Sequence, residues 1–259
     1  MPSIPVDVLR EILEHVDRAD LATICQLNKI CCSCSQDVLY RHIHLESEIA
    51  PIRQRQFYQT LAQSTHLAER VLSIYITFIE LPIFEIIAKA LRNMSSLRRL
   101  HLSGTYSNVL DGCTFRLHSF YCIRSGSDVA SFGNFLRNQT SLTGVTCWEI
   151  NPSVSIEATS LPNLTRVATS SLYWASRLIP GRPVSDVSIV GSSIENSVDL
   201  SFFTLSTAPL QKLTINYSYL YPKSGELLAS IFPSLKDLKM SFSSPNMHPV
   251  CVLFYSLSN

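Results

Sequence analysis

The sequence lacks most features that define membrane, nucleic-acid-binding or phosphate-binding proteins. Charged residues make up only 16% of the chain and the net charge is +1, so no strong field favours nucleic acid or an anionic membrane. No apolar run approaches the length of about 18 residues that a membrane-spanning helix requires. The eight glycines form no phosphate-binding loop or dinucleotide motif. We therefore predict no cofactor, no nucleic-acid partner and no membrane partner.

The first residues also lack the basic and then apolar order of a signal peptide, because Met1 leads directly into a helix start. We expect a cytoplasmic or nuclear protein. In such a reducing compartment the eight cysteines should be free thiols. Those near the N-terminus are interpreted as small core residues, namely Cys25, Cys31, Cys32 and Cys34.

The residues from Ile4 to Leu45 predict a module of three short helices. Pro5 suits a helix start, and Asp7 complements the positive end of that helix. Asp17 is expected to cap the second helix, with Asp20 three residues later. The apolar residues at helical spacing are Val8, Leu9, Ile12, Leu13 and Val16, then Leu21, Ile24 and Cys25, then Ile30, Cys31, Cys32, Val38, Leu39, Tyr40 and Ile43. A module of this size does not form a stabilising core alone.

This stretch resembles the F-box. The resemblance is carried by Ile-Pro-Val-Asp-Val-Leu at 4–9, Ile12-Leu13, Asp20-Leu21, Leu27-Asn28-Lys29 and Leu39-Tyr40-Arg41. Cys31 replaces an aromatic residue found in many members, and Ile4 and Asp7 replace the commoner leucine and glutamate.

The resemblance implies a three-helix hook that docks onto the BTB/POZ-type adaptor of an SCF ubiquitin ligase. The predicted adaptor contacts are Ile4, Pro5, Val8, Leu9, Ile12, Leu21, Ile24, Leu27 and Leu39. The alternative is that the helices only cap the domain that follows.

The predicted domains are a helical module at 1–45, a linker or connecting helix at 46–66, and a repeat domain at 67–259. The polar residues 46–56 mark the boundary, and a helix there would continue through Phe57, Leu61 and Ala62.

A repeated apolar pattern begins near Val71, with starting positions separated by 20 to 26 residues. This spacing is typical of leucine-rich repeats, whose last two apolar residues point inward from a short strand. The copies are Val71, Ile74, Ile76; Leu97, Leu100, Leu102; Leu117, Phe120, Cys122; Leu142, Val145, Cys147; Leu164, Val167, Thr169; Val184, Val187, Ile189; Leu210, Leu213, Ile215; and Leu235, Leu238, Met240.

The predicted fold class is therefore α/β: the helical module followed by an irregular leucine-rich-repeat solenoid with a parallel sheet. Helical spacing is expected near residues 83–91, 129–136 and 227–231, and a final strand at 250–255. The alternative is an ordinary α/β domain with evenly spaced strands. The pieces Leu-Pro-Asn-Leu-Thr-Arg at 161–166 and Ile-Pro-Gly-Arg-Pro-Val at 179–184 resemble fungal F-box proteins with variable repeats.

Two kinds of chemical site are weighed and not favoured. Cys31, Cys32 and Cys34 with His42 and His44 lack the paired spacing of a zinc site, so no metal is predicted. A cysteine nucleophile would lack a nucleophile elbow or oxyanion turn; the candidates are Cys113, Cys122 and Cys147, with His101 or His118 as base.

We therefore predict a protein without catalytic residues that recruits an unknown target protein to a ubiquitin ligase. The residues expected to point outward from the middle of the strands are His101, Thr146, Ser188, Thr214 and Lys239. Aromatic anchors are expected at Trp148 and Tyr217, with Tyr219 and Tyr221 close by. The alternative is a leucine-rich-repeat scaffold with no role in a ligase.

Overall fold

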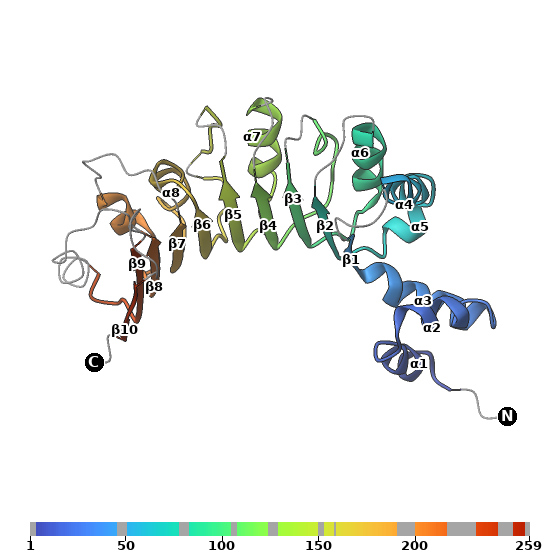
Figure 1. The fold of residues 1–259 in the computed structure, drawn as a ribbon. Coiled ribbons are helices and arrows are strands. Elements are labelled where there is room, and N and C mark those ends of the chain that lie inside the picture. The colour runs from blue at the N-terminus through green and yellow to red at the C-terminus, as the bar shows by residue number, and fades with distance from the viewer. Residues whose placement is uncertain are drawn as a thin grey trace. The chain divides into compact units, whose positions relative to one another are not determined.

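A computed structural model gives the fold of the chain (Figure 1). It describes residues 4–45, 51–77, 83–104, 108–123, 129–149, 153–157, 159–190, 200–216, 232–242 and 251–256. The chain forms two compact units. The first contains Met1–Ser103 and Asn108–Arg116, and the second contains Gly104–Ser107 and Leu117–Asn259.

The first unit begins with the three predicted helices, α1 (Val6–Leu13), α2 (Arg18–Ile24) and α3 (Lys29–Arg41). Their shared core is Leu13, Leu21 and Cys34. The N-cap residue of α3 is Asn28, whose side chain accepts a hydrogen bond of 2.9 Å from the backbone N–H of Cys31.

The structure differs from the predicted ends of these helices at three positions. Asp17 is the N-cap residue of α2, but its side chain makes no capping hydrogen bond. Pro5 lies at the N-cap of α1 and not at its first helical position. Ile43 lies beyond α3, because the chain becomes extended at His42.

Residues 51–68 form α4 (Pro51–Gln63) and α5 (Thr65–Ala68), so this part of the segment predicted as a linker or a connecting helix is helical. Leu61 and Ala62 are buried. Their carbonyl oxygens each accept a hydrogen bond of 3.1 Å from the side-chain amide of Asn93, at the end of α6 (Phe84–Asn93). This contact holds α4 against α6.

The first unit also contains three parallel strands, β1 (His42–His44), β2 (Ser73–Thr77) and β3 (Arg99–Ser103). Ile43, Ile74 and Leu100 are neighbours in the register and are all buried. Since side chains alternate along a strand, the residues before and after them lie on the opposite, outward side.

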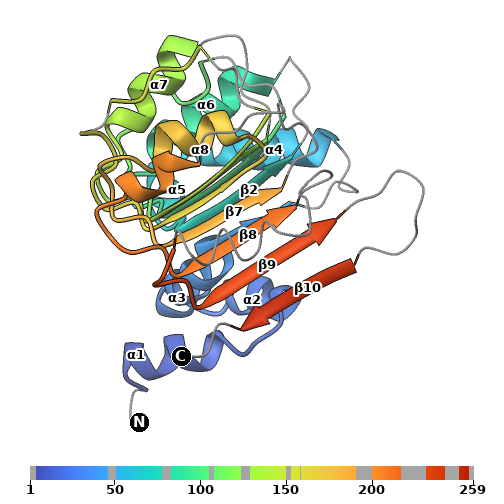
Figure 2. The ribbon, with the colours of Figure 1, turned by 90° about the vertical axis from the view of Figure 1, so that its left-hand side faces the viewer.

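The second unit contains six parallel strands that pair in chain order. They are β4 (Ser119–Ile123), β5 (Gly144–Trp148), β6 (Arg166–Thr169), β7 (Asp186–Val190), β8 (Lys212–Asn216) and β9 (Asp237–Phe242). The predicted last strand is confirmed as β10 (Cys251–Ser256), which pairs antiparallel with β9. Figure 2 shows α7 (Val129–Arg137) and α8 (Leu172–Leu178) on one side of these strands.

The predicted apolar pattern falls on these strands as expected. Every described side chain of the pattern is at most 6% exposed; that of Met240 lies outside the described part. The imperfect copy is also accommodated, because Thr169 is fully buried between Cys147 and Ile189 in the register. Its hydroxyl accepts a hydrogen bond of 3.2 Å from the backbone N–H of Ser171, which satisfies the polar group locally.

The helices expected near 83–91 and 129–136 are confirmed as α6 and α7. The one expected near 227–231 lies outside the described residues. Two helical pieces were not predicted, α8 and the 3-10 helix η2 (Ser201–Leu205). Both lie between strands and bury aromatic residues, Trp174 in α8 and Phe202 and Phe203 in η2.

A fully buried arginine connects the loops of the second unit. The guanidinium of Arg182 donates hydrogen bonds to the carbonyl oxygens of Glu157 at 2.6 Å, Ser160 at 2.7 Å and Arg177 at 2.9 Å. Burial lowers the pKa of this guanidinium. The backbone carbonyl of Arg182 accepts hydrogen bonds from Ser206 and Thr207, so one residue joins three consecutive connections.

Within the described part of the chain, no helix has the length and apolar character needed to cross a membrane. The cysteines with described side chains are free thiols, as predicted: Cys25, Cys31, Cys32, Cys34, Cys113, Cys122 and Cys147.

Candidate functional site

One face of α1 presents large apolar side chains to solvent. Val8 and Ile12 are four residues apart in α1, which places them on one side of the helix, and they are 46% and 49% exposed. Ile4, just before the helix, is 60% exposed. Leu27 and Ile30 are also exposed, at 68% and 57%. We call Ile4, Pro5, Val8, Ile12, Leu27 and Ile30 the exposed apolar set. Large apolar side chains left in water within so short a segment indicate a protein-binding surface.

Four of the predicted adaptor contacts do not belong to the exposed apolar set. Leu21 is 1% exposed, so the prediction that it offers apolar surface to a partner is wrong. Leu9, Ile24 and Leu39 are partly buried and pack against the same core. The reason is that three short helices need one shared core, and these side chains supply it. Ile30 was missed as an exposed residue because its helical spacing fits a buried stripe equally well.

Ion pairs hold the module together and attach it to the rest of the first unit. The guanidinium of Arg10 in α1 lies 2.9 Å from the carboxylate of Asp37 in α3. Arg70, just after α5, pairs with the same carboxylate and donates a hydrogen bond of 3.0 Å to the carbonyl oxygen of Ser33. Arg41 pairs with Glu14. Asp37 therefore links α1, α3 and the segment that leads into β2.

The module continues into the strands without a linker, because α3 ends at Arg41 and β1 begins at His42. The backbone N–H of Leu72 donates a hydrogen bond of 2.9 Å to the carbonyl oxygen of Arg41. Arg18 of α2 donates one of 2.6 Å to the carbonyl oxygen of His42. The helices and the first strands are thus joined by backbone and side-chain bonds.

The outward side of β1 to β3 carries a ladder of rings. His44, Tyr75 and His101 are neighbours in the register. The ring centroids of His44 and Tyr75 are 4.7 Å apart, and those of Tyr75 and His101 are 3.6 Å apart. Burial, and secondarily the charge of His44, lowers the pKa of His101 to about 4. His101 is therefore neutral at physiological pH.

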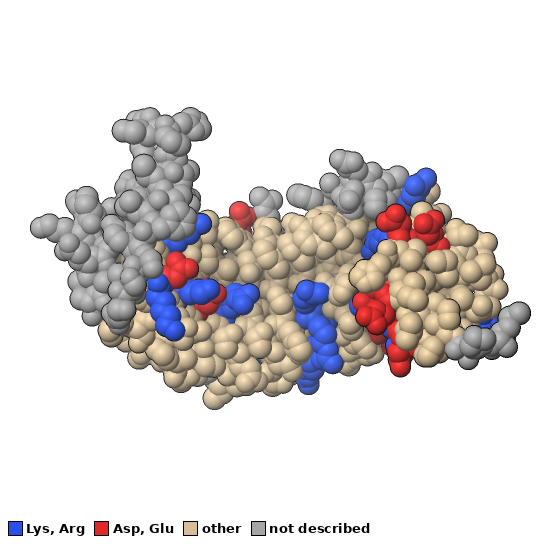
Figure 3. Space-filling model, turned by 90° about the horizontal axis from the view of Figure 1, so that it is seen from below, with Lys and Arg blue, Asp and Glu red and all other residues tan. Residues whose placement is uncertain are grey.

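Arginines lie at the start of this ladder. Arg99 is exposed, and its guanidinium lies 3.5 Å from Nδ1 of His42. Arg98 is also exposed and donates a hydrogen bond of 3.3 Å to the carbonyl oxygen of Arg116. Burial and then the charge of Arg99 lower the pKa of His42. In Figure 3 a band of Lys and Arg side chains, without Asp or Glu beside it, crosses the middle of the visible face.

The outward side of β5 to β9 is built from smaller groups. Thr146, Ala168, Ser188, Thr214 and Lys239 are neighbours in the register and are partly exposed. The sequence prediction thus identified residues that form one row on this side.

The expected aromatic anchors have less support. Trp148, at the end of β5, is partly exposed, and its indole N–H makes no hydrogen bond within the described residues. Tyr217, Tyr219 and Tyr221 lie outside the described residues.

Charges alternate in the neighbouring row of the second unit. Arg166 and Asp186 form an ion pair of 3.5 Å. Lys212 and Asp237 follow them in the register. Each cation in this row therefore has an acidic residue beside it on an adjacent strand.

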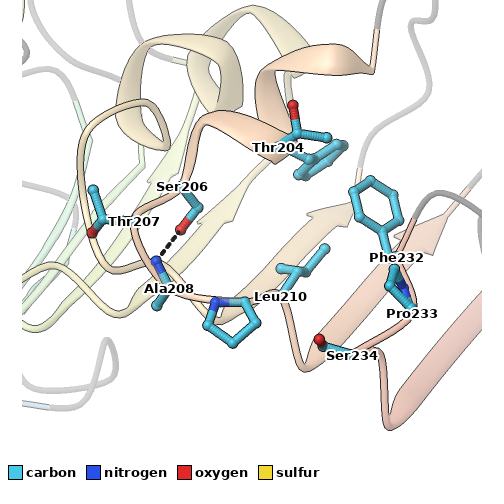
Figure 4. Close-up of a pocket in the computed structure, with 10 residues that line it drawn as sticks. Thr204, Ser206, Thr207, Ala208, Leu210, Phe232, Pro233 and Ser234 are labelled. Carbon is cyan, nitrogen blue, oxygen red and sulfur yellow. Dashed lines mark hydrogen bonds between the residues drawn. The ribbon is translucent and has the colours of Figure 1, made fainter.

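Other features of the described residues offer little chemistry. A cavity of about 250 Å³ lies between the segment after η2 and Phe232, and hydroxyl and apolar groups line it (Figure 4). Ser206 in its wall accepts a hydrogen bond of 3.3 Å from the backbone N–H of Ala208. No three His, Cys, Asp or Glu side chains in the described ranges lie close enough together to hold a metal ion.

The cysteines considered as nucleophiles are poorly suited to that role. Burial raises the pKa of Cys113 and of Cys122 to about 12, and it raises the pKa of Cys147 strongly. These thiols are therefore protonated at neutral pH and lack the thiolate that acts as a nucleophile.

Comparison with protein families identifies the helical module. Residues 1–42 match the family model of the F-box domain. F-box domains bind Skp1 and, through it, the cullin core of SCF ubiquitin ligases. The match contains the whole exposed apolar set. No curated protein is similar enough to the chain to count as a match.

Proposed function

We propose that the chain is the substrate-recruiting subunit of an SCF-type ubiquitin ligase. The exposed face of α1, inside the segment that matches the F-box, carries this proposal. Ile4, Val8 and Ile12 would bind the BTB/POZ-type adaptor of the ligase. Complete burial of such a side chain contributes about 1.5–3 kcal/mol, so these half-exposed residues offer roughly 1 kcal/mol each.

The repeated strands are proposed to be irregular leucine-rich repeats that hold the target protein. The alternation of short parallel strands with helices, and the burial of the apolar pattern, support this assignment. The chain itself would carry out no chemistry. Its contribution would be to hold the target near the ubiquitin-transferring subunits, which raises the effective concentration of the reacting groups.

The alternative is a repeat scaffold whose helices only cap the first strand. The direct passage from α3 into β1 and the pairing of Asp37 with Arg70 favour a capping role. A pure cap, however, would turn its apolar residues toward the repeats. Exposure of Ile4, Val8 and Ile12 favours the ligase role, and capping and docking are compatible because the contacts with the first strands come from Arg18 and Arg41 and leave these apolar side chains exposed.

The test is binding of purified Skp1 to the full chain, measured by calorimetry. Val8→Asp with Ile12→Asp places two charges on the exposed face of α1 and is expected to weaken binding at least a hundredfold. The matched control is Ile52→Asp, because Ile52 in α4 is 66% exposed but lies outside the segment that matches the F-box.

Both variants should unfold at the temperature of the natural chain, since the altered side chains are exposed. The ligase role is refuted if the natural chain does not bind Skp1, or if a folded double variant binds it as tightly as the control.

A further inference from the structure

The first three strands place a set of cationic and aromatic groups on one side. Alternate residues of a strand share a face, so His42 and His44, Ser73 and Tyr75, and Arg99 and His101 all lie opposite the buried Ile43, Ile74 and Leu100. Arg98 directly precedes β3, and its backbone N–H bonds to the same carbonyl oxygen, that of Leu72, as the N–H of Arg99. We call Arg98, Arg99, His42, His44, Tyr75 and His101 the basic ladder.

Within the described part of the chain, the cations of the basic ladder lack carboxylate partners. Neither Arg98 nor Arg99 forms an ion pair with any described residue. The charges that act on His42 are those of Arg99, Arg41, Arg18 and Glu14. Glu14 is the single acid among them and pairs with Arg41. Counting the described residues alone, this surface is therefore positive, although the chain as a whole is nearly neutral.

The rings beside these cations form one row, in which neighbouring rings are tilted by 33° and 40°. His44, Tyr75 and His101 contact one another in register, so each limits the movement of the next. Tyrosine and histidine combine an apolar body with a polar edge, which suits contact with an extended peptide. Because His101 is neutral near pH 7, it adds contact area without needing its own counter-ion.

We propose that the basic ladder binds an acidic segment of the target protein, with its anionic groups on Arg98 and Arg99 and the adjoining chain over the three rings. The anionic groups are carboxylates or phosphates, both of which match the fork of an arginine side chain. A peptide is favoured over nucleic acid because the net charge is only +1 and the described row of Arg166, Asp186, Lys212 and Asp237 has acids beside its cations. This inference rests on the proposed function and names the chemical class of the target.

The test is fluorescence anisotropy with four labelled probes and the full chain: a glutamate-rich peptide, a phosphoserine peptide, a glutamine-rich peptide of equal length, and single-stranded DNA. At least one anionic peptide is expected to bind about tenfold more tightly than the glutamine peptide, and binding should weaken with added salt. Which of the two anionic peptides binds better separates carboxylate from phosphate recognition.

Arg98→Gln with Arg99→Gln is expected to reduce that binding about tenfold. Lys212→Gln serves as the control, because Lys212 is also exposed but has acidic neighbours in the register, and it should change binding less than twofold. The proposal is overturned by equal binding of all peptides, by an arginine variant that binds like the control, or by tighter binding of DNA than of either anionic peptide.

Skp1 binding is measured on the same samples. The arginine variant should retain it, because neither arginine belongs to the exposed apolar set. If the natural chain does not bind Skp1 but does bind the anionic peptide, the ligase role is refuted and the peptide site on the basic ladder is supported.

Discussion

The outward sides of the two units use charge in opposite ways. In the second unit Arg166, Asp186, Lys212 and Asp237 alternate along one register row, so each positive group has a negative neighbour within the protein. In the first unit the equivalent row is His42, Ser73 and Arg99, with no acid. A surface that satisfies its own charges offers a partner little electrostatic gain. The uncompensated row is therefore the better candidate for target recognition.

The largest expected effect comes from reversing the charge of the basic ladder. Arg98→Glu with Arg99→Glu places two carboxylates where an anionic peptide would bind, and like charges in contact repel strongly. Affinity for the anionic peptide should fall about a hundredfold, as measured by anisotropy at low salt. A fall no larger than that caused by the neutral glutamine variant would mean that charge is not the recognition principle.

A smaller effect is expected from removing the acids of the second unit. Asp186→Asn with Asp237→Asn leaves Arg166 and Lys212 without their acidic neighbours, which makes this face resemble the basic ladder. Binding of the same peptide should rise about threefold through the added positive field. Thr214→Asn, on the same face, keeps every charge and should leave affinity unchanged. An unaltered affinity in the double variant would show that cations alone, without the rings, do not make a site.

A further expected effect is on stability in acid. The pKa of His101 is about 4 in the folded chain and near 6.5 when unfolded, so between these values the unfolded chain binds more protons. Its contribution to stability is complete above pH 6.5 and is lost as the pH falls from 6.5 toward 4.

Denaturant midpoints at pH 7.5 and pH 5 measure this loss. His101→Gln should reduce the difference between the two midpoints. His15→Gln, at an exposed position of the helical module, should leave it unchanged. If both variants keep the full difference, another group causes the acid sensitivity.

Inward-facing residues could be predicted from the sequence because burial follows the apolar period directly. The spacing of Leu97, Leu100 and Leu102, for example, is sufficient to place two side chains on the buried face of a strand. The outward row of Thr146, Ser188 and Thr214 followed from the same period.

Contacts between distant residues could not be predicted in this way. The neighbours of Arg99 in the register are Ser73 and, one strand further, His42, neither of which is an acid. This register is set by packing across the strands and not by the spacing of residues along one strand. In the helical module, Leu21 and Ile12 are both apolar and at helical spacing, yet one is buried and the other exposed. The helical spacing of apolar residues alone does not show which side of a small helix faces the module's own core and which side faces a partner.

The unbroken passage from α3 into β1 has a consequence for ubiquitin transfer under the proposed function. Because Asp37 and the Arg41 carbonyl tie the helices to the segment before β2, a target held on the first strands cannot swing on a flexible tether. Its distance from the ligase is set by folded structure. Which lysines of the target come within reach is then decided by the target's own shape and pose, so receptors of this design would mark few sites and mark them reproducibly.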